Sequence, residues 1–250
     1  MTKTTHALTA AVLPFVLAVA SACASTKPSE MKDEQLGQLP LEDRQAILEQ
    51  ERSVDVAKSN VEAAKAASQQ ASEFKTLVDS ELEAAKADRD AADKVSGLSY
   101  GANKSAAEQA AARRQVAAQQ VAAAEAKSQY AQKLAELRAA EVEQREAEHT
   151  LAQARLERAK YETLQRRGMA EGVDRQAILD AERDADQQRA EAHQKVRQLD
   201  GYADMSKSTW EQAQKQYQAS AQGTQIDDRA VPPPSGAKYI PQQAGAKQQD

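Results

Sequence analysis

Few side chains in this 250-residue sequence are of the types that perform chemistry at a site. Three histidines and one cysteine are the residues most suited to metal binding, proton transfer or nucleophilic attack. His149 and His193 lie in charged, helix-forming stretches, and neither has a second histidine or a cysteine at metal-ligand spacing. No glycine-rich phosphate loop and no strand candidate accompanies them. We therefore expect helix-surface histidines and no catalytic residue, metal, cofactor or small-molecule substrate.

Cys23 is the exception, because the only cysteine of the chain stands at the end of an export signal. The signal begins with the basic Lys3, continues through an apolar run from Ala7 to Ala20 and ends in Ala-Ser-Ala. The run is short for a bilayer-spanning helix and Pro14 interrupts it, so an uncleaved membrane helix is the weaker alternative. A lone cysteine in an exported chain cannot form an intramolecular disulfide. Its position at the cleavage boundary therefore points to modification.

The segment Ala20-Ser21-Ala22-Cys23 resembles the lipobox of bacterial lipoproteins. In that family the cysteine thiol receives a diacylglyceryl group, and cleavage leaves the acylated cysteine at the mature N-terminus. The resemblance implies that residues 1–22 are a lipoprotein signal peptide and that Cys23 carries fatty acids such as palmitate. Ala24 stands where aspartate would signal inner-membrane retention, which favours the periplasmic side of the outer membrane. The alternative is ordinary cleavage after Ala-Ser-Ala, which would release a soluble protein with a free thiol.

The mature chain is organised around the stretch from Ser105 to Arg167, which contains no proline or glycine. Ser105 and Glu108 form a capping box at its start, and Gly168 marks its end. One helix of this length would extend about 90 Å at 1.5 Å per residue. Aromatic residues make up only 4% of the chain, so little large apolar surface exists to form a globular core. The composition and the helix length together predict a rod.

A first helix is expected over 41–95, after residues 23–40, which we interpret as a flexible tether. Apolar residues recur in this helix at heptad spacing, and two adjacent rows of them predict a coiled-coil seam. One row contains Ala57, Ala64, Ala71, Val78, Ala85 and Ala92, and the adjoining row contains Ile47, Val54, Val61, Phe74, Leu77 and Leu82. A lone helix of this kind would expose its apolar stripe, so it needs a partner.

Two further helices are expected over 105–167 and 174–221, with Gly168 ending the former and Asp174 capping the latter. Apolar residues in the middle helix depart from a strict repeat of seven, which suits contacts with neighbours on more than one side. In the last helix, Gly201 would bend or stop the chain. Ser208 with Glu211 resembles a capping box that would restart it.

Residues 222–250 carry a different signal, because prolines return at Val231-Pro232-Pro233-Pro234 and at Pro241. Such a segment favours extended polyproline conformation over helix. We interpret it as a disordered Pro-rich tail, with a docking peptide for an aromatic groove as the alternative.

The segment from Leu156 to Asp180 (LERAKYETLQRRGMAEGVDRQAILD) is similar to the helical hairpin tip of periplasmic adaptor proteins, the membrane fusion proteins of tripartite efflux pumps and type I secretion systems. The resemblance implies a tip that docks to another envelope protein. Its partner-docking residues would be Leu164, Gly168, Gly172 and Asp174. The flanking sequence differs from that family, since helix and tail stand where adaptors carry lipoyl and β-barrel segments.

The formal net charge of −5 and the alternating signs along the helices exclude a nucleic-acid surface. The sequence therefore predicts an all-α, elongated, antiparallel three-helix coiled coil over 41–221, tethered through Cys23 to a membrane. The expected function is that of a structural spacer or scaffold in the cell envelope, through self-association or a helical envelope partner, and not that of an enzyme. An accessory, adaptor-like component of an envelope transport, secretion or motility complex is the alternative.

Overall fold

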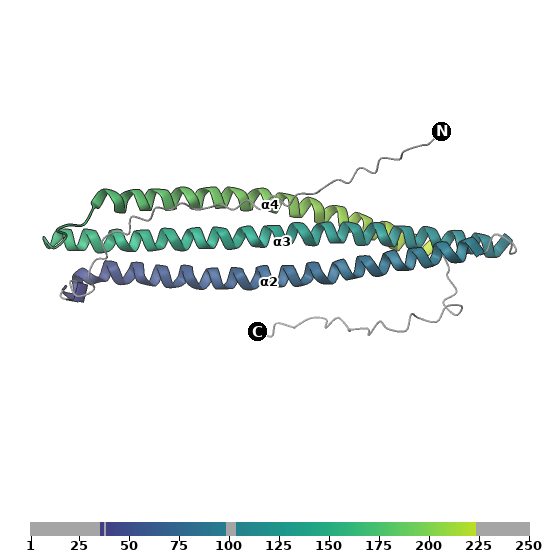
Figure 1. Cartoon of the computed structure of the whole chain (residues 1–250), viewed down its shortest axis with the longest axis horizontal. Helices are drawn as coiled ribbons and strands as arrows, with labels where there is room; N and C mark the ends of the chain where they lie inside the picture. Colours follow the sequence, from purple (N-terminus) through teal and green to yellow (C-terminus); the bar gives the residue numbers. More distant parts are fainter. Residues whose placement is uncertain (1–35, 38, 99–103, 224–250) are drawn as a thin grey trace, which may run out of the picture.

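Three long α-helices make up nearly all of the chain that the computed structural model describes, which comprises residues 36–37, 39–98 and 104–223. The helices are α2 (Leu41–Leu98), α3 (Lys104–Arg166) and α4 (Arg175–Gly223). Each runs antiparallel to the next, and together they form an elongated rod (Figure 1). The 63 residues of α3 correspond to a length of about 95 Å. The predicted fold, an elongated antiparallel assembly of three helices, is confirmed.

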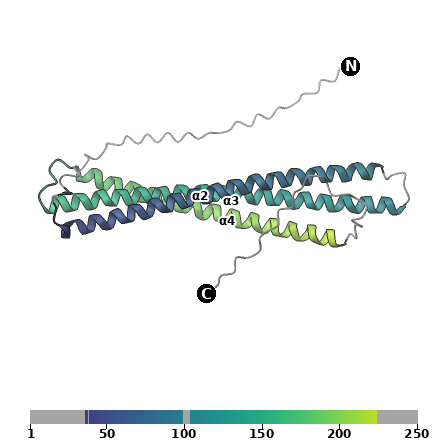
Figure 2. The ribbon, with the colours of Figure 1, turned by 90° about the horizontal axis from the view of Figure 1, so that it is seen from below.

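α3 is the central helix of the rod. Both α2 and α4 pack along it, whereas α2 and α4 hardly approach each other. Figure 1 shows α3 between the two over much of its length, and in the view of Figure 2 the outer helices exchange sides along the rod because the helices wrap around one another. The prediction that the middle helix has neighbours on more than one side is confirmed.

The seam between α2 and α3 consists largely of small side chains. Buried residues of α2 include Ile47, Val61, Ala71, Val78 and Ala85, which belong to the two predicted heptad rows. Alanine at these positions lets the helix backbones approach closely, although each methyl group removes little apolar area from water. Long uninterrupted contact along the rod replaces the large side chains of a globular core.

Leu77 was wrongly assigned to this seam, because its side chain is 58% exposed. It directly precedes Val78, which is fully buried. Neighbouring residues on a helix point about 100° apart, so a residue adjacent in sequence to a central seam position faces away from it. Phe74, one turn earlier, is partly buried and takes the place expected for an apolar side chain of that row.

The helix ends agree with the predicted ones to within a few residues. α2 extends three residues beyond the predicted end at Val95, and α3 begins at Lys104, which places Ser105 inside the first turn and not at the N-cap. α3 ends at Arg166 and α4 begins at Arg175, one residue inside the predicted bounds in each case.

The expected interruption of the last helix at Gly201 and Ser208 is wrong, since α4 is continuous across both. One glycine inside a helix costs only about 1 kcal/mol relative to alanine, and the nearby Ala203 is buried against the rod. The hydroxyl of Thr209 donates to the carbonyl oxygen of Met205 at 3.0 Å, as it does within a continuous helix. Packing therefore overrides both local signals.

Candidate functional site

The turn between α3 and α4 contains the candidate docking residues, and its geometry follows from Gly168. Gly168 has a φ of 68°, in the left-handed region that favours glycine. Its N–H donates to the carbonyl of Gln165 at 3.0 Å, and the N–H of Met169 donates to the carbonyl of Leu164 at 2.9 Å. This pair of hydrogen bonds is a Schellman motif, which satisfies carbonyl groups at the end of α3.

The other side of the turn is closed by Asp174, the predicted N-cap of α4. Its Oδ1 accepts hydrogen bonds from the backbone N–H groups of Gln176 at 2.9 Å and Ala177 at 3.2 Å. Gly172, with a φ of 79°, provides the second left-handed residue of the turn. The chain reverses within a few residues, and both predicted caps are confirmed.

The underside of the turn packs against the start of α2. Leu164 is fully buried in a cluster with Leu39 and Ile47. Met169 and Ala170 of the turn and Leu36, which precedes α2, pack against the same cluster. Leu164 therefore does not face solvent, whereas Gly168, Gly172 and Asp174 are exposed. The last residues of the predicted tether belong to this packed end of the rod.

A second assembly of side chains joins all three helices near the middle of the rod. The ring of Tyr130 on α3 stacks on that of Trp210 on α4, with centroids 5.5 Å apart and planes 9° apart. Phe74 on α2 meets Tyr130 edge to face at 6.5 Å, and the Nζ of Lys127 lies 5.9 Å from the centre of the Phe74 ring. Through Tyr130 these aromatic contacts attach each outer helix to α3 at the same level of the rod.

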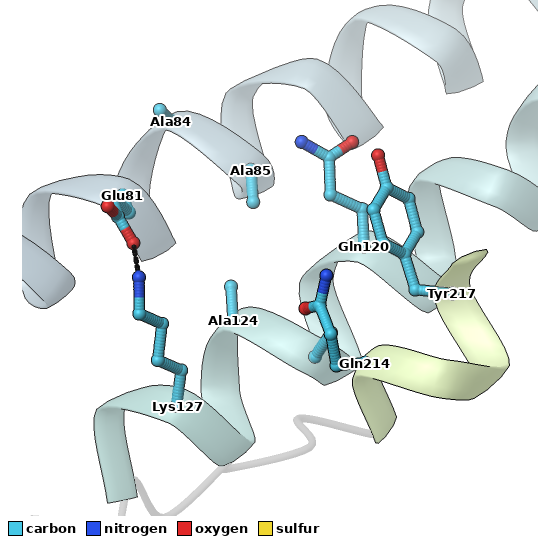
Figure 3. A pocket seen from close by; sticks show the side chains of 9 residues that line it. Glu81, Ala84, Ala85, Gln120, Ala124, Lys127, Gln214 and Tyr217 are labelled. Atoms are coloured by element: carbon cyan, nitrogen blue, oxygen red, sulfur yellow. Dashed lines mark hydrogen bonds and ion pairs between the residues drawn. The ribbon is translucent and has the colours of Figure 1, made fainter. Parts of the chain in front are cut away.

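Beside this aromatic layer an open groove of about 340 Å³ lies between α2 and α4, with α3 as its floor. Four alanines line its middle, and Gln120, Gln214 and Tyr217 lie together at one end (Figure 3). At the other end Lys127 forms an ion pair with Glu81. A shallow trough with methyl-lined walls encloses little of a small ligand, so its chemistry is that of a packing surface.

Glu148 is the most highly connected carboxylate of the rod. It accepts hydrogen bonds from Gln144 at 2.9 Å and Arg145 at 2.7 Å, and its Oε1 lies 3.2 Å from the Nε2 of His193. Partial burial raises the pKa of Glu148, but these two hydrogen bonds and the charges of Arg145 and His193 outweigh burial and lower the pKa below its usual value. His193 is thus part of a contact between α3 and α4, as a helix-surface residue.

The described ranges contain no group of three or more His, Cys, Asp or Glu side chains arranged to hold a metal ion. None of the helices in these ranges has an apolar stretch long enough to cross a bilayer. Cys23, the predicted lipidation site, and the Pro-rich tail from residue 224 onward lie outside the described residues.

Sequence reasoning found the turn but missed the aromatic layer and the Glu148 contacts. Trp210 and Tyr217 stand seven residues apart, a spacing that puts them on one face of a helix, yet nothing in the sequence states which residue of α3 faces them. The register between helices decides those contacts, and many registers of an alanine-rich seam look alike in sequence.

Comparison with known proteins yields no match to this chain among protein-family models, curated proteins or solved structures.

Proposed function

We propose that the protein is a cell-envelope lipoprotein that acts as a structural spacer or scaffold in the periplasm. The observation that carries this proposal is the shape, because a continuous helix of 63 residues forms the axis of a thin rod. Such a rod holds its two ends about 90 Å apart, and charged residues of both signs are exposed along its helices. A partner can bind along its length or at either end.

The direction in which the helices run along the rod is consistent with anchoring through Cys23. α2 begins at the same end of the rod as the turn between α3 and α4, since Asp43 pairs with Arg167. Cys23 precedes Leu41 by about 18 residues, so a lipid at Cys23 would keep this end close to the membrane. The other end, with the end of α2 and the start of α3, would then point away from it.

The adaptor-like alternative has less support from the turn itself. The apolar residues Leu164 and Met169 are turned inward onto α2, so the exposed part of the tip offers backbone and polar groups. The same tip lies at the end where the N-terminal segment joins the rod, and a membrane anchor there would restrict its access to a distant channel. A role in a larger envelope complex would rely more readily on the opposite end or on the side of the rod.

The first test is the intact mass of the protein extracted from membranes, compared with a Cys23→Ala variant. We expect the mature chain to start at Cys23 and to carry a diacylglyceryl group and an additional acyl chain, and the variant to lack this mass and to leave the membrane fraction. An unmodified mature chain that stays soluble would overturn the lipoprotein assignment.

The spacer role needs a separate test, because lipidation alone does not establish it. A variant lacking matched heptads, residues 64–70 of α2, 140–146 of α3 and 195–201 of α4, shortens each helix by about 10 Å. If the rod sets a distance in the envelope, this deletion changes that distance in electron micrographs of cell sections. An unchanged envelope spacing with a folded, membrane-bound variant would argue against a spacer.

A further inference from the structure

The rod has an uncovered end, because α4 stops before it has covered the whole of α3. Lys195 of α4 pairs with Glu143, and farther along, Tyr217 lies beside Gln120 in the groove. Continued at this antiparallel register, Gly223 at the end of α4 faces the turn around Ala117. Within the described part of the chain, residues 104–116 of α3 therefore have α2 alone beside them, and Figure 1 shows α2 and α3 continuing past the end of α4.

The uncovered face is a continuation of the α3–α4 interface. The face of α3 toward α4 is marked by Tyr130, whose ring stacks on Trp210; Ala123 and Leu137 in the same heptad row are buried, as are Ala126 and Ala140 in the adjoining row. The heptad rows of Ala123 and Ala126 continue toward the start of α3 as Val116 and Ala112, which are only partly buried. Gln109, one heptad before Val116, is polar and exposed. The apolar part of the interface therefore continues beyond the helix that covers it as far as Ala112.

A positive charge on this face, unpaired within the described ranges, favours a segment that carries carboxylates. Arg113 lies beside the two rows and has no ion-pair partner among the described residues. Arg114, its neighbour, is already paired with Asp93 of α2 at 2.7 Å. The chain that follows α4 begins Thr224-Gln225-Ile226-Asp227-Asp228, so one apolar residue and two carboxylates follow directly after Gly223.

We propose that residues 224–230 of the same chain lie along this face of α3, with one of the two carboxylates, that of Asp227 or that of Asp228, paired with Arg113. The length fits, because seven extended residues reach about 23 Å and the uncovered part of α3 is about 20 Å long. Counted from Gly223 at about 3.3 Å per residue, Ile226 lies near the methyl group of Ala112, and Thr224 lies near Val116. The prolines from Pro232 onward then begin at the end of the rod, so the Pro-rich segment leaves the molecule there.

This inference does not depend on the lipid anchor. Combined with an anchor at Cys23, it would place the Pro-rich segment at the end of the rod that points away from the membrane, where it could meet a partner.

Trypsin cleavage of the full chain tests the proposal, because Arg229 lies inside the docked segment and Lys238 lies beyond it. The rates of cleavage after these two residues are measured by mass spectrometry, and their ratio is compared with that in a synthetic peptide of residues 224–250. The peptide corrects for the effect of the neighbouring aspartates on trypsin. We expect cleavage after Arg229, relative to Lys238, to be about tenfold slower in the full chain than in the peptide.

Substitutions then test whether the slower cleavage after Arg229 depends on the ion pair with Arg113. Arg113→Gln, or Asp227→Asn with Asp228→Asn, should remove most of the protection, and the two changes together should remove no more than either alone. Arg183→Gln is the control, because Arg183 pairs only with Asp180 on its own helix and should leave the ratio unchanged. Circular dichroism checks that each variant keeps its helix content.

Three results would overturn the proposal. Equal cleavage ratios in the full chain and in the peptide would show that the segment is not docked. Protection that survives Arg113→Gln in a folded variant would place the segment elsewhere. Protection that is lost on dilution, with a sedimentation mass of two chains, would mean that a second copy covers this face instead.

Discussion

Arg167, just after the end of α3, binds Asp43 in the first turn of α2, although the two residues are 124 positions apart in the chain. The Nε of Arg167 donates to Oδ2 of Asp43 at 2.7 Å, and its Nη2 donates to the same oxygen. Asp43 also lies where the positive end of the α2 dipole favours a carboxylate. The ion pair fixes the start of α2 against the turn between α3 and α4.

Breaking this ion pair should have a small but measurable effect. Arg167→Ala and Asp43→Ala should each lower the free energy of unfolding, and a double-mutant cycle should give a coupling of about 0.5–1 kcal/mol, because the Arg167 side chain is half exposed. Urea unfolding at low and high salt provides the measurement. A coupling that does not decrease in high salt would show that the contact is not mainly electrostatic.

Leu164 should be the most sensitive position of the turn. Leu164→Ala removes a fully buried side chain from the cluster with Leu39 and Ile47, so we expect a loss of about 2–4 kcal/mol in the free energy of unfolding. Leu77→Ala is the matched control, because its side chain is 58% exposed and should change the stability by less than about 0.5 kcal/mol. Equal losses in the two variants would contradict the packing of the turn on α2.

Replacing glycine by alanine should destabilise the protein at position 168 and stabilise it at position 201. Gly168→Ala forces a side chain into a left-handed residue, and because no atom would clash with the new methyl group, the cost of about 1–2 kcal/mol comes from the backbone alone. Gly201 lies inside α4 with free space around it, so Gly201→Ala should stabilise the protein by about 1 kcal/mol. Thermal unfolding of both variants tests the pair, and a destabilising Gly201→Ala would be evidence against a continuous α4.

Trp210 should tolerate phenylalanine better than alanine. Its indole Nε1 is buried and has no hydrogen-bond partner within the described structure, so Trp210→Phe removes an unsatisfied donor while keeping a ring on Tyr130. We expect a loss of about 1 kcal/mol or less for Trp210→Phe and about 3 kcal/mol for Trp210→Ala. Chemical unfolding followed by circular dichroism compares the two variants. A cost for phenylalanine as large as that for alanine would mean that the indole N–H has a partner.

The helices themselves could be predicted from the sequence because their signals are local. Long stretches without proline or glycine, the glycine at 168 and the capping aspartate at 174 each act within a few residues. The errors arose where a local signal competed with packing. Gly201 and Ser208 suggested a break, but the contacts of α4 along α3 stabilise a continuous helix by more than one glycine costs.

The candidate site was predictable only in part. The turn residues follow from backbone chemistry, whereas the burial of Leu164 depends on residues at the start of α2 that are more than a hundred positions away. The same holds for Tyr130 and Trp210, since heptad spacing defines a helix face but not the register between two faces. An alanine-rich seam permits several registers between two helices, and larger side chains such as these rings favour one of them.

Glu148 should make the protein less stable in acid. Its pKa is lower in the folded protein than the ordinary value of 4.5, so the folded state favours the charged form. The resulting stabilisation is fully present above the unfolded pKa and is lost as the pH falls through the folded pKa. The free energy of unfolding should therefore decrease as the pH is lowered from about 6 to about 3, with Asp79 and Glu136, whose pKa values are also lowered, contributing in the same direction.

Glu148→Gln should remove part of this decrease, so the difference in the free energy of unfolding between the variant and the native protein should shrink in acid. Glu171→Gln, at an exposed position of the turn, is the control for the substitution itself and should change the free energy of unfolding at neutral pH by less than about 0.5 kcal/mol. Urea unfolding across this pH range measures both variants, and a constant difference between Glu148→Gln and the native protein would show that Glu148 keeps the same pKa when the chain unfolds.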